Sequence, residues 1–149
     1  MKAKLTLAAV AIACISAAGC GASANSGTQA ASAAGNPCQA LSAWKGGGGT
    51  TGMNTIASDL SSVESAGSAE NMTELASAGQ TLDNDAQNAA LNAPPIDALD
   101  FTNAMAEFQT AGTDLAMGTQ SGLTSSETPL TSGSKEFESF AASVKATCG

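Results

Sequence analysis

The sequence contains no histidine, no arginine and no tyrosine. Histidine is the commonest general base and metal ligand near neutral pH, and arginine is the usual clamp for phosphate groups. Five basic side chains stand against thirteen acidic ones, for a formal net charge of −8 at pH 7. A chain this acidic has no basic footprint for nucleic acid, so we expect no nucleic-acid partner.

Large apolar side chains are also scarce. From Cys38 onward, Leu, Ile, Val and Phe together number 17 of the 112 residues. A low content of large apolar residues in a negatively charged chain is typical of disorder. Alanine, the strongest helix former, is abundant here, and only 12% of the whole chain is charged. We therefore expect helices with a thin apolar core.

The amino-terminal segment has the order of a secretory signal peptide. Lys2 and Lys4 precede an apolar run over residues 5–18, and charge followed by an apolar stretch is the pattern of such signals. The run is shorter than the roughly 20 residues that a membrane-spanning helix needs. It therefore predicts a removable segment.

The tetrapeptide Ala-Ala-Gly-Cys that ends at Cys20 resembles the lipobox of bacterial lipoproteins, although Ala17 stands where that motif usually has Leu. The resemblance implies removal of residues 1–19, diacylation of Cys20, and a lipid anchor on the extracytoplasmic face of the cell membrane. Two alternatives remain. A second lipobox-like motif ends at Cys14, and an ordinary cleavage site ending at Ala24 would release a soluble secreted protein.

The lipobox resemblance also predicts which cysteines remain free to form a disulfide. Cys14 would be lost with the signal and Cys20 would carry lipid, which leaves Cys38 and Cys148. Exported compartments are oxidising, so the two remaining thiols are expected to pair. In the chain-entropy model, closing a loop of about 110 residues is worth on the order of 4 to 5 kcal/mol.

The predicted organisation has three parts: a signal peptide over 1–19, a flexible tether of small residues over 20–37, and a domain over 38–149. Loss of Lys2 and Lys4 leaves three lysines against thirteen acids, so anionic headgroups would repel the domain. The acyl chains must then hold it to the membrane.

The pattern as a whole resembles small Ala/Gly-rich acidic lipoproteins of actinobacteria, mycobacteria included. The resemblance rests mainly on residues 17–20 and implies no activity. Such lipoproteins often carry O-linked sugars near the anchor, and the candidates here are Ser23, Ser26, Thr28 and Ser32.

Apolar residues recur at spacings of three and four in four separate segments, which predicts one apolar face on each of four helices. The four sets are Met53, Ile56, Leu60 and Val63; Met72, Leu75, Gly79, Leu82 and Ala86; Phe101, Met105, Phe108, Gly112 and Leu115; and Phe137, Phe140 and Val144. No alternating run indicates a strand. The expected fold is all-α, an antiparallel bundle of about four helices with a short leading helix at 39–44, closed by the terminal disulfide.

Capping chemistry suggests where these helices begin and end. The expected boundary signals are Ser68 with Glu70 as a helix start, Pro94-Pro95 as a separator, and Thr128-Pro129 or Ser132 as the start of the last helix. The run of four glycines, 46–49, predicts a mobile connector after Trp44. Trp44 itself is expected to cover the disulfide.

Residues 72–82 align without gaps on residues 105–115, and both copies contain Ala-Gly. Two copies are too few for a solenoid. We therefore interpret Gly79 and Gly112 as small residues where two helices approach closely.

Motifs for chemistry are almost absent, and no cofactor or metal is expected. The glycine run lacks the Gly-Lys-Ser/Thr of a phosphate loop. Residues 83–88 begin like a calcium loop but lack its glycine and its final glutamate. Four methionines could line an adaptable groove for a lipid or a partner helix; these are Met53, Met72, Met105 and Met117.

The sequence thus favours a non-enzymatic, lipid-anchored binding or adaptor module of the cell envelope, with an envelope protein or an apolar molecule as partner. One alternative is a carrier of an apolar small molecule or lipid, and another is a soluble secreted helical protein. A hydrolase would need two inward-facing carboxylates in one cleft.

Overall fold

The computed structural model describes residues 36–149. The predicted signal peptide, the lipidation site Cys20, the alternative sites Cys14 and Ala24, the sugar-acceptor candidates and residues 20–35 of the tether lie outside the described residues.

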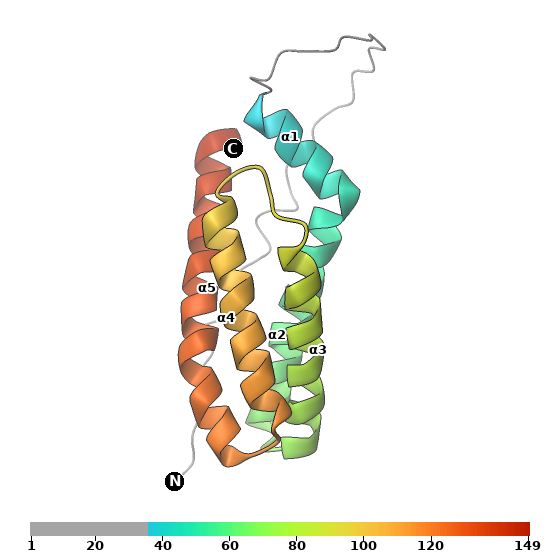
Figure 1. Ribbon diagram of the computed structural model, residues 1–149, viewed down its shortest axis with the longest axis vertical. Helices are drawn as coiled ribbons and strands as arrows, with labels where there is room; N and C mark the ends of the chain where they lie inside the picture. Colours follow the sequence, from blue (N-terminus) through green and yellow to red (C-terminus); the bar gives the residue numbers. More distant parts are fainter. Residues whose placement is uncertain (1–35) are drawn as a thin grey trace.

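Four long helices run up and down side by side, and a short helix leans across one pole (Figure 1). In chain order the elements are α1 (Pro37–Trp44), a π-helical turn (Lys45–Gly49), α2 (Thr50–Ser68), α3 (Met72–Ala90), α4 (Ala98–Ala116) and α5 (Gln120–Cys148). No strand occurs between residues 36 and 149. The all-α bundle and its short leading helix are therefore confirmed.

The predicted apolar faces meet along the axis of the bundle. Ile56, Leu82, Phe108 and Phe140, one from each long helix, are at most 1% exposed. Phenylalanine rings fill the half of the core nearer the disulfide, where Phe101 and Phe140 lie 5.2 Å apart in an edge-to-face arrangement. Four helices with few large side chains thus share one continuous core.

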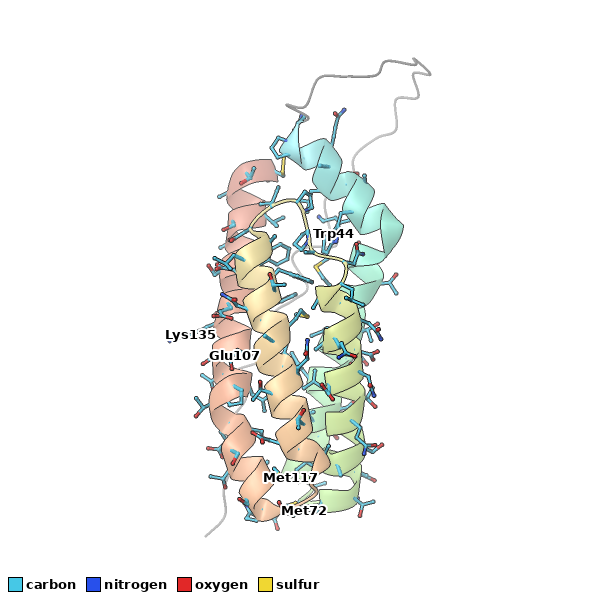
Figure 2. The ribbon with its side chains drawn as sticks, in the orientation of Figure 1. Trp44, Met72, Glu107, Met117 and Lys135 are labelled. Atoms are coloured by element: carbon cyan, nitrogen blue, oxygen red, sulfur yellow. A yellow bond between two sulfur atoms is a disulfide. The ribbon has the colours of Figure 1, made fainter. Side chains whose placement is uncertain are left out.

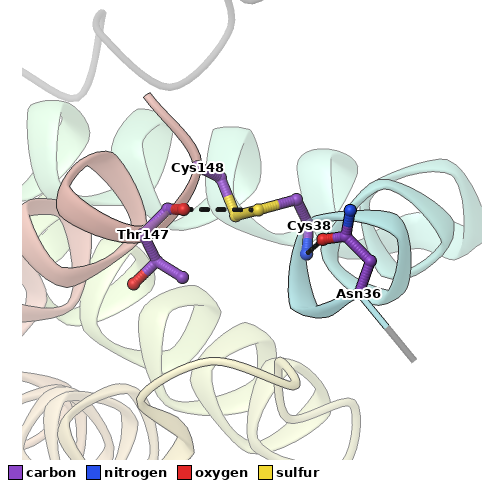
Figure 3. The surroundings of a disulfide bond; sticks show 4 residues. All are labelled: Asn36, Cys38, Thr147 and Cys148. Carbon is purple, nitrogen blue, oxygen red and sulfur yellow. Dashed lines mark hydrogen bonds between the residues drawn. A yellow bond between two sulfur atoms is a disulfide. The ribbon is translucent and has the colours of Figure 1, made fainter. Parts of the chain in front are cut away.

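A disulfide between Cys38 and Cys148 joins α1 to the end of α5, with their Cα atoms 5.5 Å apart (Figure 3). The pairing predicted from the cysteine count is confirmed. The Asn36 side chain caps α1 by accepting a hydrogen bond from the backbone N–H of Cys38, 3.0 Å away. Both ends of the described chain, and the connector between α3 and α4, therefore lie at one pole (Figure 1).

The sequence suggested that Trp44 covers the disulfide, but its contacts in the structure are with the α3–α4 connector and the aromatic core. Its indole N–H donates to the backbone carbonyl of Asn92, 2.7 Å away, and its ring meets Phe101 and Phe140 edge-on. Buried tryptophan needs both a packing surface and a partner for its N–H. Trp44 finds both here and fastens α1 to the α3–α4 connector.

The glycine run, which its composition predicted to be a mobile connector, takes a defined helical conformation. It forms a π-helical turn that continues α1 into α2. Gly48 has a φ of 116°, which side-chain-bearing residues rarely adopt. A Cβ on Gly49 would lie 2.5 Å from the indole of Trp44. Gly48 is therefore needed for the bend and Gly49 for close packing under the ring, whereas a Cβ on Gly46 or Gly47 would meet nothing within 4 Å.

The boundary between α2 and α3 differs from the expectation that Ser68 and Glu70 start a helix. Ser68 is the last residue of α2, and Glu70 takes the left-handed conformation with a φ of 53°. The N–H groups of Glu70 and Asn71 close back onto the carbonyls of Gly67 and Ala66, which is the Schellman arrangement usually built on glycine. Asn71 then caps α3 by accepting from the N–H of Glu74.

Helix α5 begins well before the predicted starts at Thr128-Pro129 and Ser132, which were wrong. Thr119 caps it by accepting from the N–H of Gly122, and Pro129 lies inside the helix. Proline removes a backbone hydrogen bond. The buried stripe nevertheless continues through this stretch, where Ser126 and Gly133 alternate with two leucines and interrupt the apolar periodicity. Its members are Leu123, Ser126, Leu130 and Gly133.

Gly79 of α3 and Gly112 of α4 face each other, as the repeat predicted. A Cβ on Gly79 would lie 2.8 Å from the carbonyl oxygen of Gly112, and a Cβ on Gly112 would lie 2.7 Å from that of Gly79. Real Cβ atoms essentially never come this near to backbone atoms. The close approach of α3 and α4 therefore depends on both glycines.

Candidate functional site

A groove of about 560 Å³ runs between α2 and α3. These helices pack less closely than α3 with α4 or α4 with α5. Hydroxyl and carboxyl groups dominate its lining, which consists of Ser58, Asp59, Ser61, Ser62, Ser65, Ala66, Glu74, Ser77, Ala78 and Thr81. No motif or apolar spacing in the sequence predicted this surface.

Hydroxyl protons in the groove are partly committed to the helices themselves. Ser62 donates to the carbonyl of Ser58 at 3.0 Å, and Thr81 donates to that of Ser77 at 3.1 Å. A hydroxyl group has one proton and two lone pairs. With the proton used inside the helix, these side chains offer the groove acceptors rather than donors.

Asp59 is the buried carboxyl group of this groove. Its side chain is only 8% exposed, and its Oδ2 atom has no hydrogen-bond partner among the described residues. Burial, the negative charge of Asp85 and a hydrogen bond with Asp85 together raise the pKa of Asp59 from its usual 3.8 to about 6. Near neutral pH, Asp59 therefore takes up a proton more readily than an exposed aspartate would.

Asp85 lines a second, smaller hollow of about 180 Å³ at the disulfide end of the seam. This hollow also includes Trp44, Asn88, Asn92 and Thr55. Asp59 lines the groove and Asp85 lines the hollow. Neither depression contains both carboxylates in its lining.

The spacing of Asp59 and Asp85 from apolar residues on the same helices indicates that both side chains face the core. Asp59 follows Ile56 by three residues, and Asp85 follows Leu82 by three, so each occupies a position on a core-facing stripe. A carboxyl group at such a position must be buried or partnered. Residues 83–88 lie within helix α3, so the calcium-loop resemblance is wrong. Within residues 36–149 no three acidic or cysteine side chains gather in a metal-binding group.

The four methionines do not share one surface. Met53 and Met105 are buried in the core, at 3% and 0% exposure. Met72 and Met117 lie at the pole far from the disulfide, where Met72 is half-buried and Met117 is 55% exposed (Figure 2). Two of the four are therefore ordinary core residues.

A second carboxyl group with a buried oxygen lies on the opposite side of the bundle. Oε2 of Glu136 on α5 is buried and has no partner within the described part of the chain. Burial and the charges of Glu107 and Asp100 on α4 raise its pKa. Lys135 and Glu107 mark this face in Figure 2. Glu136 lines neither the groove nor the smaller hollow, and we therefore centre the site on Asp59.

The burial of Asp59 predicts a pH-dependent stability. The pKa of Asp59 in the folded protein lies above the usual 3.8, so protonation of Asp59 stabilises the folded state. This contribution to the free energy of unfolding is lost as the pH rises through about 6. Asp59→Asn should therefore raise the melting temperature at pH 7.5 and flatten its change between pH 4 and 7. Thermal unfolding followed by circular dichroism would measure both.

Glu127→Gln removes one exposed carboxylate from α5 and serves as the matched control. Its melting temperature should change with pH as that of the wild type does. If Asp59→Asn destabilised the protein at pH 7.5, or kept the wild-type slope, the assignment of a buried carboxylate penalty to Asp59 would be wrong.

Between residues 36 and 149, no helix combines the length and the apolar character needed to cross a bilayer. No protein-family model matches the chain, and comparisons with curated proteins and with solved structures return no significant match.

Proposed function

We propose that this chain is a lipid-anchored, non-enzymatic binding module of the cell envelope, and that the groove between α2 and α3 is its binding surface. The observation that carries the proposal is Asp59, a buried carboxyl group with an unpartnered oxygen at the edge of an open groove. Leaving a buried polar atom unpaired costs about 1 to 3 kcal/mol. A ligand that supplied the missing hydrogen bond would recover part of that free energy.

The lining of the groove favours a polar ligand over an apolar one. Eight of its ten side chains carry a hydroxyl or a carboxyl group, whereas pockets for apolar cargo are lined mainly by aliphatic and aromatic side chains. A carrier of lipid is therefore the second candidate. Exposed Leu91 and Leu99, which flank the α3–α4 connector, are the observation that favours an apolar contact at the disulfide pole.

Occupation of the groove can be tested with a blocking substitution. Ser62 is exposed and lines the groove, so Ser62→Trp should fill it without disturbing the core. Native mass spectrometry of protein purified from its own membranes should detect a non-covalent ligand on the wild type and not on Ser62→Trp.

Ser139→Trp places the same side chain on exposed α5 and is the control for general effects of an added indole. It should retain the ligand. A ligand held equally by all three proteins, or by none of them, would refute the groove as the binding surface.

The membrane anchor is a separate prediction, supported by the lipobox resemblance at residues 17–20. Cys20→Ser should move the protein from the membrane fraction to the medium or leave it unprocessed, because the acylated sulfur is lost. Intact mass of the wild-type protein should correspond to a diacylated chain that begins at Cys20.

Cys14→Ser is the matched control and should retain normal processing and membrane association. Unchanged retention of Cys20→Ser with normal cleavage would contradict the anchor. A mature chain that begins at Asn25 would establish the secreted alternative.

A further inference from the structure

The groove between α2 and α3 offers hydrogen-bond acceptors and negative charge. Asp59 and Glu74 contribute carboxyl groups, and the protons of Ser62 and Thr81 are bonded within their own helices. No lysine lines the groove or the neighbouring hollow in the described part of the chain. Such a surface suits a ligand that is rich in donors and positively charged.

We propose, resting on the binding function above, that the groove recognises a primary ammonium group, with Asp59 as its main contact. The buried side chain of Asp59 has one unpartnered oxygen, Oδ2. An ammonium group is a compact donor with three hydrogens and can bond the carboxyl group of Asp59 and nearby hydroxyls together. A guanidinium group needs two parallel acceptors on one carboxylate to use its planar fork.

A metal ion fits this site less well than an ammonium group. Ca²⁺ takes six to eight oxygen ligands, and no group of three or more acidic or cysteine side chains exists in residues 36–149. An ammonium group requires only two or three acceptors, which Asp59 and the hydroxyl groups on α2 and α3 can supply.

The size of the groove indicates that the ammonium group belongs to a larger molecule. A volume of about 560 Å³ lies within the usual range for small-molecule sites, about 300 to 1,000 Å³. The rows of hydroxyl oxygens along both helices can accept hydrogen bonds from the rest of that molecule. Either an extended polyamine or an amino sugar carries the required group.

Isothermal titration calorimetry at pH 7.5 and low salt tests the proposal with two dications. Cadaverine carries primary ammonium groups, whereas hexamethonium carries the same charge without N–H donors. We expect cadaverine to bind at least about tenfold more tightly than hexamethonium, since charge-assisted hydrogen bonds add to simple attraction. Equal affinities, or no detectable binding of cadaverine, would overturn the proposal.

The Asp59→Asn variant identifies the contact. It should weaken cadaverine binding at least about tenfold, while Glu127→Gln should bind like the wild type. Folding is not expected to fail in Asp59→Asn, because the substitution removes a buried charge and keeps the side-chain shape. Unchanged affinity in Asp59→Asn would overturn the assignment.

The pH supplies an independent readout. The charged groups around Asp59 are Asp85 across the seam and Glu74 farther along the same groove. Lowering the pH from 7.5 to 5 protonates Asp59, whose pKa is about 6, and should weaken cadaverine binding by the wild type. Glu127→Gln should show the same loss, whereas a wild-type affinity that did not change with pH would contradict the proposal.

Two further arms separate the outcomes. Glucosamine carries a free ammonium group and N-acetylglucosamine does not, so only glucosamine should bind. Tighter binding of glucosamine than of cadaverine would identify an amino sugar, and the reverse a polyamine. Ser62→Trp blocks the groove for any ligand. A native ligand lost from Ser62→Trp but retained by Asp59→Asn would overturn the ammonium inference and leave the binding function standing.

Discussion

Replacing Cys38 and Cys148 together by serine is expected to lower the melting temperature of the domain by more than 10 °C. The disulfide spans 110 residues of sequence, and a loop of that size is worth about 4 to 5 kcal/mol in the chain-entropy model. In a domain near this size, about 1 kcal/mol corresponds to about 4 to 8 °C. The thin core of this bundle leaves little reserve to absorb the loss.

Fluorescence of the single tryptophan measures whether loss of the disulfide displaces α1. Trp44 is on α1, between the disulfide and the bend into α2, and it packs on Phe101 and Phe140. If the disulfide holds α1 in place, the double variant should show a red-shifted Trp44 emission below its main unfolding transition.

Cys148→Ser alone leaves a free thiol on Cys38, so comparison with the double variant isolates effects of that thiol. Both should melt at similar temperatures. A double variant within about 3 °C of the wild type would contradict a major stabilising role for the bond, since this corresponds to under about 1 kcal/mol.

Gly112→Ala is expected to destabilise the bundle by about 2 to 3 kcal/mol. The added Cβ would lie 2.7 Å from both the backbone nitrogen of Asp83 and the carbonyl oxygen of Gly79. Backbone atoms cannot rotate away as a side chain can, so α3 and α4 must separate. The intrinsic helix preference of alanine over glycine, about 1 kcal/mol, offsets only part of this cost. Chemical denaturation would measure the difference.

Gly52→Ala is the matched control, because Gly52 also lies inside a long helix. Its added Cβ would find only the Cβ of Ala89, 4.0 Å away. We expect this variant to be stabilised by up to about 1 kcal/mol. Equal stability changes in Gly52→Ala and Gly112→Ala would show that α3 and α4 tolerate separation.

The sequence by itself determined the helical class, the buried faces of α2, α3, α4 and the second half of α5, and the disulfide partners. Residues three and four apart share a helical face whatever the helix packs against, so Ile56, Leu60 and Val63 could be placed on one face directly. The matched positions of Gly79 and Gly112 also identified the close helix pair, because only small residues permit such an approach.

Tertiary structure alone decided the helix ends and the candidate site. Glu70 adopts a left-handed conformation, and Pro129 stays inside α5, because packing of the neighbouring helices outweighs local preferences, including the cost of about 3 kcal/mol for proline inside a helix. Asp59 and Asp85 are 26 positions apart in sequence, and their position on apolar stripes predicted only that each needed burial or a partner. Their meeting depends on how α2 is set against α3, a relation that spacing along one helix does not contain.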